Sequence, residues 1–455
     1  MTRLFFSLFL SATGLLLNAK VYVAEVFTSN MVIQQQKNII VWGKADAGEK
    51  VNVRLGSQNQ TVTADAQGKW SVALKPMNAS MKPLVMTIKS KQNKILLKNL
   101  LIGEVWLASG QSNMEYSMHE HLKYKKPKKG DPDRLLHEWE QARNENIRVL
   151  YVRKDLNGEL LPTEGWQRVD TTSLKPFSAP AWFFAKMLQD SLRVPVGIIT
   201  SAWGGTKIEV WTPDKGDRYN HMIRPMVPMA LRGFLWYQGE TNLINGDIEA
   251  YAPKFEHLVD SWRKAWGDDT LPFYYVQISP YTYSQRKDYI VPHTWQDLPR
   301  FWQVQARGME IPHTGMVVTT DLPEDLNDIH PPYKWIVGER LCRWALRHTY
   351  GYDHIECQGP VLHKATIQGD KAIMEFDHAD DGLMTADGKE PDWFYTNSRG
   401  GRFYKTKAVI SGNSVIVDIN PKERHPVVRF GFDEVAQPNL RNHAGLPAQP
   451  FEYKF

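Results

Sequence analysis

Between residues 21 and 98, short apolar runs alternate with polar turn clusters such as residues 46–48 and 66–68. Each run is four or five residues long. This spacing is typical of antiparallel strands in a small sandwich. We therefore predict an N-terminal β-sandwich-like domain over residues 20–100, whose strands include the runs Ile39–Trp42, Val51–Leu55, Trp70–Leu74 and Leu84–Ile88.

The last hundred residues show a similar pattern. Strand-like runs are again separated by Gly, Asp and Asn, which favour turns. We predict a C-terminal β-rich domain over residues 353–455, with strands at 365–367, 372–376, 408–410, 415–419 and 427–430.

The pattern changes in the middle of the chain. Six apolar runs are continuous rather than alternating, as strands covered on both faces require. Residues 181–192 and 251–266 have the three- and four-residue spacing of helices. Alternating strands and helices predict an α/β fold, a doubly wound parallel sheet over residues 101–352, with strands at 105–108, 147–152, 196–200, 233–236, 273–278 and 316–319.

The N-terminal segment has the features of a secretory signal. Arg3 precedes an apolar run from Leu4 to Leu17, and Asn18 and Ala19 follow it. A run of fourteen residues is too short to span a bilayer as a helix, so we predict no membrane insertion. We expect residues 1–19 to be a signal peptide and the mature chain to be exported, periplasmic or extracellular.

Composition excludes several classes of protein. The net charge of +5 comes from 55 basic and 50 acidic residues, which is too balanced for a large nucleic-acid footprint, so no nucleic-acid partner is expected. Two cysteines are too few for a disulfide framework. In an oxidising compartment Cys342 and Cys357 could pair; equally, one could be a buried thiol and the other an unrelated exposed one. The sequence does not predict the oligomeric state.

Four points at strand ends carry chemistry, because ligands bind beyond the carboxyl ends of parallel strands. Ser112 follows the first run on a turn preceded by Gly110, where its hydroxyl would be accessible. A serine at such a place is more often structural, and the pattern lacks the second glycine of the Gly-x-Ser-x-Gly elbow of α/β-hydrolases. Gly204 and Gly205 follow the third run; they could expose amides to an oxyanion, or simply form a tight turn.

The other two points supply an amide and an imidazole. Asn242 follows the fourth run and could donate to a developing negative charge, although an isolated asparagine there more often caps a turn. His330 follows the last run with Asp321, Asp325 and Asp328 nearby, so it could accept a serine proton while a carboxylate orients it. Four such groups at one edge of one sheet predict a nucleophilic acyl-transfer site.

A metal site is not expected. His119 and His121 flank Glu120, but His-x-His without further ligands at a recognised spacing is weak evidence for a metal. The proposed chemistry needs no metal or organic cofactor.

These residues lie in stretches that resemble the SGNH (GDSL-like) hydrolases, and more closely their sialate O-acetylesterase family. The similarity extends to the leading β region and the terminal residues, and so covers nearly all of the mature chain. The stretches are GEVWLASGQSNME (103–115), WGGTKIEVW (203–211), WYQGETN (236–242), DIHPPYK (328–334) and NLRNHAGLPAQPF (439–451).

The resemblance implies roles for individual residues. Ser112 would be the nucleophile and His330 the general base, and the amides of Ser112 and Gly205 with the side chain of Asn242 would form the oxyanion hole. Many SGNH enzymes place the supporting Asp three residues before the histidine; here that position is Asn327, while Asp328 lies two before, as in the esterase family. Asp328 is thus the expected third member, and Asp325, Asp321 or a backbone carbonyl are the alternatives. Gln111, Gln238 and Glu240 are expected to contact substrate.

The implied activity is a serine esterase that removes O-acetyl groups from sugars, with sialic acids as the leading substrates, through an acetyl-enzyme intermediate. Sialic acid carries a carboxylate, so a basic residue such as Lys207 is expected near the site, although Lys207 could equally be an ordinary surface residue. An esterase for acetylated xylan or another plant polysaccharide is the alternative within the same chemistry. A non-catalytic carbohydrate-binding protein is the alternative outside it.

Overall fold

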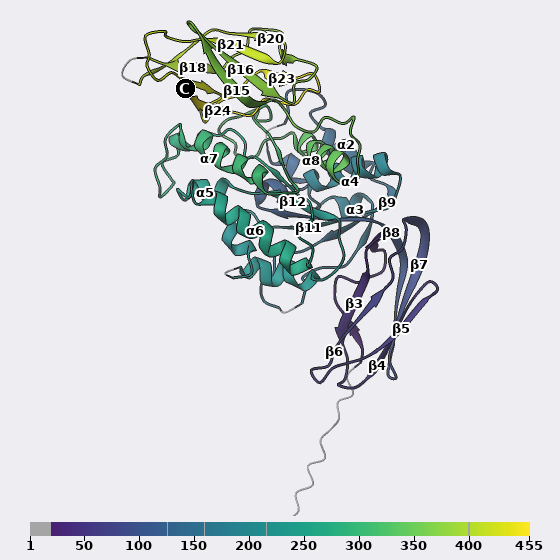
Figure 1. Cartoon of the computed structure of the whole chain (residues 1–455). Helices are drawn as coiled ribbons and strands as arrows, with labels where there is room; N and C mark the ends of the chain where they lie inside the picture. The colour runs from purple at the N-terminus through teal and green to yellow at the C-terminus, as the bar shows by residue number, and fades with distance from the viewer. Residues whose placement is uncertain (1–19, 125, 159, 215, 399–400) are drawn as a thin grey trace, which may run out of the picture.

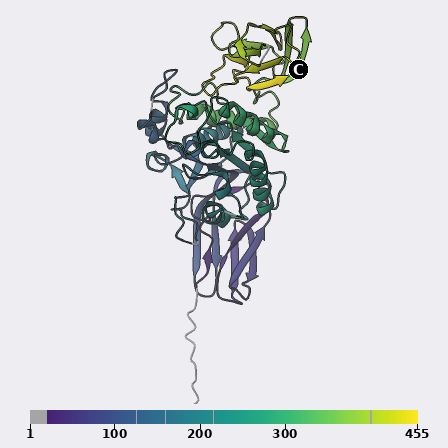
Figure 2. The same cartoon turned by 90° about the vertical axis from the view of Figure 1, so that its left-hand side faces the viewer.

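The computed structural model describes residues 20–124, 126–158, 160–214, 216–398 and 401–455. The predicted signal segment, residues 1–19, lies outside the described residues. Three parts follow one another along one axis, with an α/β unit between two β-rich units (Figure 1). The view turned by 90° shows the same order (Figure 2). The α/β class and the β-rich regions are therefore confirmed.

The N-terminal part contains one small sheet, with the order β1-β3-β6. Its other strands extend the central sheet: β4 pairs with β5 and β7, and β7 pairs with β8. Alternate residues such as Val51, Val53 and Leu55 on β4 are fully buried, as expected of strands with one face on a core. The strands are β1 (Tyr22–Val23), β2 (Val32–Gln34), β3 (Ile39–Lys44), β4 (Lys50–Leu55), β5 (Gln58–Thr63), β6 (Lys69–Leu74) and β7 (Ser80–Lys89).

Strand β8 (Lys94–Gly110) belongs to two parts of the molecule. Its first half pairs with β7 in antiparallel fashion, and Leu101–Gly103 pair with β2 in parallel. Its second half pairs in parallel with β11 on one side and β12 on the other. The domain boundary predicted at residue 100 therefore falls inside a single continuous strand.

The central sheet has the order β10-β9-β11-β8-β12-β13-β14. Every neighbouring pair from β9 to β14 is parallel, and β10 is antiparallel to β9. Because β8 lies between β11 and β12, the loops after these three strands meet at the same edge. The remaining strands of this sheet are β9 (Asn144–Tyr151), β10 (Gln167–Val169), β11 (Val196–Ala202), β12 (Gly233–Tyr237), β13 (Phe273–Val276) and β14 (Thr314–Val317).

Helices cover both faces of this sheet. Buried residues of α4 (Ala179–Leu192) and α8 (Lys334–His348) share a core with one face, and those of α6 (Tyr251–Trp266) and α7 (Asp297–Ala306) share a core with the other. The second core is continuous with that of the N-terminal part. The shorter helices are α1 (Ser112–Glu115), η1 (Glu120–Leu122), α2 (Arg134–Glu140), α3 (Thr171–Leu174), η2 (Ile208–Trp211), η3 (Tyr219–Ile223), η4 (Arg224–Met226), α5 (Glu240–Ile244), η5 (Tyr283–Gln285) and η6 (Arg307–Glu310).

The C-terminal part consists of two four-stranded sheets and one two-stranded sheet around its own apolar core. Its strands are β15 (Val361–Gln368), β16 (Lys371–Asp377), β17 (Leu383–Thr385), β18 (Phe394–Asn397), β19 (Phe403–Lys405), β20 (Ala408–Ser411), β21 (Ser414–Asp418), β22 (Val427–Phe430), β23 (Leu440–Asn442) and β24 (Phe451–Lys454).

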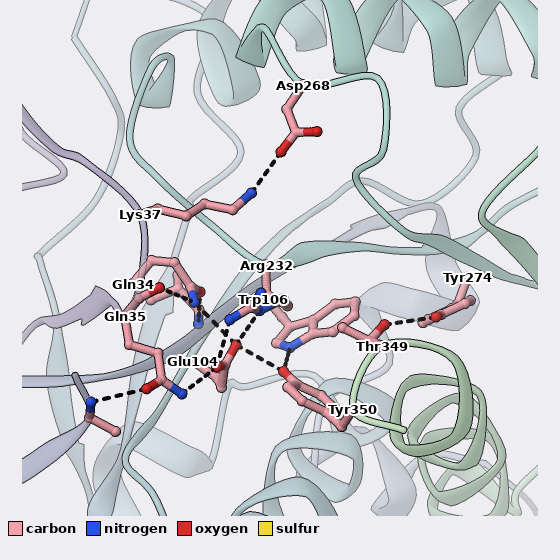
Figure 3. Close-up of polar contacts among 12 residues, drawn as sticks. Gln34, Gln35, Lys37, Glu104, Trp106, Arg232, Asp268, Tyr274, Thr349 and Tyr350 are labelled. Atoms are coloured by element: carbon pink, nitrogen blue, oxygen red, sulfur yellow. Dashed lines mark hydrogen bonds and ion pairs between the residues drawn. The ribbon is translucent and has the colours of Figure 1, made fainter. Parts of the chain in front are cut away.

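A buried carboxylate joins the N-terminal part to the central unit at the amino edge of the central sheet (Figure 3). Glu104 on β8 is fully buried. Arg232, just before β12, donates to it through Nε at 2.7 Å and Nη2 at 3.0 Å, and the Tyr350 hydroxyl donates at 2.9 Å. Gln34 and Gln35 of the N-terminal part donate at 3.2 and 2.7 Å. We call these five residues the Glu104 cluster.

Two further observations bear on the sequence predictions. Among the described residues, no helix is both long and apolar enough to cross a membrane. Cys342 and Cys357 are free thiols in the structure, and both are buried, so neither is the exposed thiol that the sequence allowed.

Candidate active site

The predicted nucleophile lies on a tight turn at the end of β8. Gly110 has φ +138°, and a Cβ there would lie 2.1 Å from the Tyr237 carbonyl oxygen of β12. Only glycine permits this close approach of the two strand ends. Ser112 follows as the first residue of α1 and remains partly exposed. The sequence therefore places its hydroxyl at the carboxyl edge of the sheet.

The predicted base, His330, is far from this serine in the sequence but close to it in space. His330 lies on the loop between β14 and α8, 218 residues from Ser112, and its Nε2 is 3.0 Å from Ser112 Oγ. The sequence predicted that Ser112 and His330 lie at one edge of the sheet, and in the structure they are within hydrogen-bonding distance. The ring of Tyr124, centred 4.8 Å from that of His330 and stacked on Tyr116, forms a wall beside the pair.

Asp328 lies behind the imidazole. Its Oδ1 is 3.4 Å from His330 Nδ1 and also accepts the His330 backbone amide at 2.9 Å. Burial acts to raise the pKa of this carboxyl, but the interactions with His330 outweigh it, so the pKa of Asp328 lies below its ordinary value. Of the alternatives, Asp321 accepts two hydrogen bonds from Arg340, at 2.8 and 2.6 Å, and Asp325 accepts the amide of Asn327 at 2.9 Å.

The glycines after β11 bring backbone amides to the serine. A Cβ on Gly204 would lie 3.2 Å from the Ser112 Cβ, and the Gly204 amide donates to Glu115 Oε2 at 2.6 Å. Gly205 has φ +72° and is exposed. Within the described part of the chain, the amides of Ser112 and Gly205 donate to no protein atom, so they remain available for a ligand.

Asn242 is placed differently from the prediction. It is fully buried, and its Nδ2 donates to Asp247 at 2.9 Å and to Glu209 at 3.2 Å. Its Oδ1 accepts from Gln238 Nε2 at 2.7 Å and from the Ile208 amide at 3.0 Å. Two carboxylates, which are stronger acceptors than water, thus take both amide protons. In this arrangement Asn242 cannot donate to an oxyanion, and it instead ties η2 to the turn after β12.

The three residues expected to contact substrate lie beneath the site. Gln111, Gln238 and Glu240 are at most 3% exposed. Gln111 Oε1 accepts the Thr241 amide at 3.3 Å, and Gln238 Oε1 accepts the Tyr251 hydroxyl at 2.9 Å. Through these hydrogen bonds Gln111 and Gln238 support the turns that carry the site.

Sequence reasoning missed a buried polar cluster next to the nucleophile. Asn113 donates to Glu240 Oε1 at 2.5 Å and to the Ile329 carbonyl at 3.1 Å, and it accepts from Lys334 Nζ. Asn113, Glu240 and Lys334 are at most 1% exposed. We call them the Asn113 cluster. Asn113 and Lys334 lie within the stretches that resemble the esterase family (103–115 and 328–334). Asparagine and lysine are usually exposed, so the sequence alone does not indicate that these two are buried.

Two cations lie near the glycine turn. Lys154 pairs with Glu115 at 2.5 Å, and the same carboxylate holds the Gly204 amide. The Arg218 guanidinium lies 4.4 Å above the ring of Trp203. Lys207, the basic residue considered from the sequence, is exposed. In the described residues, no group of three or more His, Cys, Asp or Glu side chains could hold a metal ion.

The comparisons with known proteins agree with this chemistry. Residues 102–345, more than half of the chain, match the family described as carbohydrate esterase, sialic acid-specific acetylesterase. The chain belongs to this family. It is therefore a carboxylic ester hydrolase of the carbohydrate esterase type. The family resemblance inferred from the sequence is confirmed.

Relatives of this carbohydrate esterase extend the match beyond the central unit. The sialate O-acetylesterase of Homo sapiens is 26% identical over 401 residues, covering 77% of this chain and 75% of the relative. That of Mus musculus is 26% identical over 435 residues, with 77% of each chain covered. The crystal structure of a carbohydrate acetylesterase from Xanthomonas citri has a TM-score of 0.85 and 29% identity, covering 95% of this chain and 99% of that one.

Proposed function

We propose that this carbohydrate esterase releases acetate from O-acetylated sugars by a double displacement on Ser112. His330 Nε2 accepts the Ser112 proton as Oγ forms a bond to the acetyl carbon. The tetrahedral intermediate collapses, the sugar oxygen leaves with the proton from His330, and water then releases acetate by the same steps in reverse. The observation that carries the proposal is the 3.0 Å contact between Ser112 Oγ and His330 Nε2, with Asp328 behind the ring.

The oxyanion is assigned to two backbone amides, those of Ser112 and Gly205. Asn242 is left out because both of its amide protons are donated to carboxylates. Removing one oxyanion donor costs about 3 to 4 kcal/mol in the transition state of serine hydrolases. The order of the parallel strands and the helices on both faces also support assigning the central unit to the doubly wound SGNH type.

We infer that the preferred substrates are O-acetylated sialic acids. The family description and the names of the mammalian relatives support this. The cations Lys154 and Arg218, which lie near the glycine turn, could interact with the carboxylate of such a sugar. Acetylated xylan remains the alternative substrate. Export is proposed from the signal-like pattern of residues 1–19 alone.

Replacing the nucleophile tests the mechanism. Ser112→Ala should abolish release of acetate from 4-nitrophenyl acetate and leave the melting temperature unchanged, because the hydroxyl is partly exposed and makes one described contact. Ser117→Ala, five residues further along, is the matched control and should keep full activity. Turnover that persists in Ser112→Ala would remove Ser112 from the role.

A substrate comparison tests the specificity. Purified protein is incubated with O-acetylated sialic acids and with acetylated xylan, and free acetate is measured. A higher kcat/KM for the sialic acids supports the proposal. A higher value for xylan would transfer the assignment to a plant-polysaccharide esterase.

A further inference from the structure

The side chain next to the nucleophile bridges the two catalytic loops. Asn113 directly follows Ser112, and its Nδ2 donates to the carbonyl of Ile329, the residue directly before His330. This hydrogen bond therefore joins the turn after β8 to the loop before α8. It runs beside the contact between Ser112 Oγ and His330 Nε2.

The orientation of the Asn113 amide is fixed from both ends. The Ile329 carbonyl can only accept, so Nδ2 of Asn113 must face it and the oxygen faces Lys334. The Ile329 carbonyl and Glu240 Oε1 accept the two protons of Nδ2. Both protons and the oxygen of the amide group thus have a partner, and the group has one allowed orientation. Its backbone is equally constrained, because it lies in the first turn of α1.

The groups that hold Asn113 are costly to bury. Burial lowers the pKa of Lys334 to about 7, although the carboxylates of Glu240, Asp328 and Glu120 act in the opposite direction. Burial raises the pKa of Glu240, and its Oε2 has no hydrogen-bond partner among the described residues. The Lys334 Nζ is 4.7 Å from the centre of the Tyr116 ring. A buried lysine and a half-satisfied carboxylate add little to stability compared with apolar residues of the same size.

We propose that Asn113, clamped by Lys334 and Glu240, is a positioning residue that sets the distance between Ser112 and His330. It contacts the loop of the base and not the substrate. Loss of the bond to Ile329 would free the start of the His330 loop, and a displacement of about 1 Å in reacting groups costs about a hundredfold in rate. The inference rests on the proposed roles of Ser112 and His330.

The test replaces Asn113 by its closest analogue. Asn113→Asp keeps the shape but removes both donors and places a carboxylate oxygen against the Ile329 carbonyl. Reactive sites are counted by stoichiometric labelling with diethyl 4-nitrophenyl phosphate, and kcat for 4-nitrophenyl acetate is expressed per labelled site. We expect kcat per site to fall about a hundredfold and KM to change less than twofold.

Asn442→Asp provides the matched control. Asn442 is 3% exposed, donates to the carbonyls of Gln358 and His378, and accepts the Leu446 amide, all in or beside the C-terminal part. The same chemical change should lower stability there and leave kcat per site unchanged. An Asn113→Asp protein with the same kcat per site as Asn442→Asp would overturn the proposal, because Asn113 would then be only structural.

A second pair of variants decides the matter if Asn113→Asp does not fold. Glu240→Gln keeps an oxygen for Asn113 Nδ2, whereas Glu240→Ala removes it. If Asn113 is a positioning residue, kcat per site should stay within about threefold of wild type in Glu240→Gln. In Glu240→Ala it should be at least about tenfold lower than in wild type. Equal values would contradict the clamp. Failure of the positioning role can be told apart from failure of the proposed mechanism. If Ser112 is not the nucleophile, Ser112→Ala will still be labelled and active, whatever the Asn113 variants show.

Discussion

Two buried carboxylates at opposite edges of the central sheet have opposite surroundings. Glu104, at the amino edge, accepts five hydrogen bonds from Gln34, Gln35, Arg232 and Tyr350 (Figure 3). Glu240, at the carboxyl edge, accepts one from Asn113, and its second oxygen has no partner among the described residues. The amino edge is built for stability, while the carboxyl edge keeps poorly satisfied groups beside Ser112, as functional sites often do.

The largest effect is expected at the amino edge. Glu104→Ala leaves the largely buried Arg232 guanidinium without its carboxylate, and breaking such a pair costs about 3 to 5 kcal/mol. We expect the free energy of unfolding in urea to fall by about this amount and kcat per active site to stay within twofold. Glu164→Ala, which breaks an exposed pair with Arg153, should change stability by less than about 1 kcal/mol. A large loss of kcat in Glu104→Ala without a comparable fall in the free energy of unfolding would contradict the comparison.

The opposite result is expected for Asp328 at the carboxyl edge. Asp328→Asn removes the charge that orients the His330 ring and stabilises the imidazolium, so kcat should fall at least about a hundredfold. The melting temperature should change little, because the side chain is partly exposed. Asp325→Asn is the control, with a much smaller loss of kcat. The reverse order of the two variants would reject Asp328 as the third member.

A smaller effect is expected in how the free energy of unfolding depends on pH, through the buried Lys334 at the carboxyl edge. The pKa of Lys334 is about 7, below its ordinary 10.5, so between these values the unfolded chain binds more protons than the folded one. The stability of wild type should therefore rise with pH relative to Lys334→Met, by at most about 1.4 kcal/mol per pH unit. The groups facing Lys334 are the carboxylates of Glu240, Asp328 and Glu120 and the rings of Tyr116 and Tyr237.

Urea unfolding of both proteins from pH 7 to 9 measures this difference. Lys389→Met removes a largely exposed lysine and serves as the control, with no dependence on pH expected in this range. A constant difference between wild type and Lys334→Met across the range would show that Lys334 does not change protonation between the folded and unfolded states there.

The sequence predicted what depends on local pattern. The six apolar runs became β8, β9 and β11 to β14, because strands covered on both faces are apolar throughout. The meeting of Ser112 and His330 followed from the rule that places ligands at the carboxyl edge. The failures concern side chains whose partners are set by tertiary packing. Nothing near Asn242 in the sequence shows that Glu209 lies beside it, and Lys334 reads as an ordinary surface lysine until the fold encloses it.

Because β8 is continuous, the N-terminal β unit and the esterase unit share one strand and one apolar core. A chain shortened to begin at residue 101 would keep the half of β8 between β11 and β12 but lose β7 and the N-terminal portion of the apolar core that continues into the α6 face. The amino edge of the sheet would then lack Gln34 and Gln35 as well. We therefore expect that the unit that carries Ser112 cannot be detached, and that both units unfold together in a single transition.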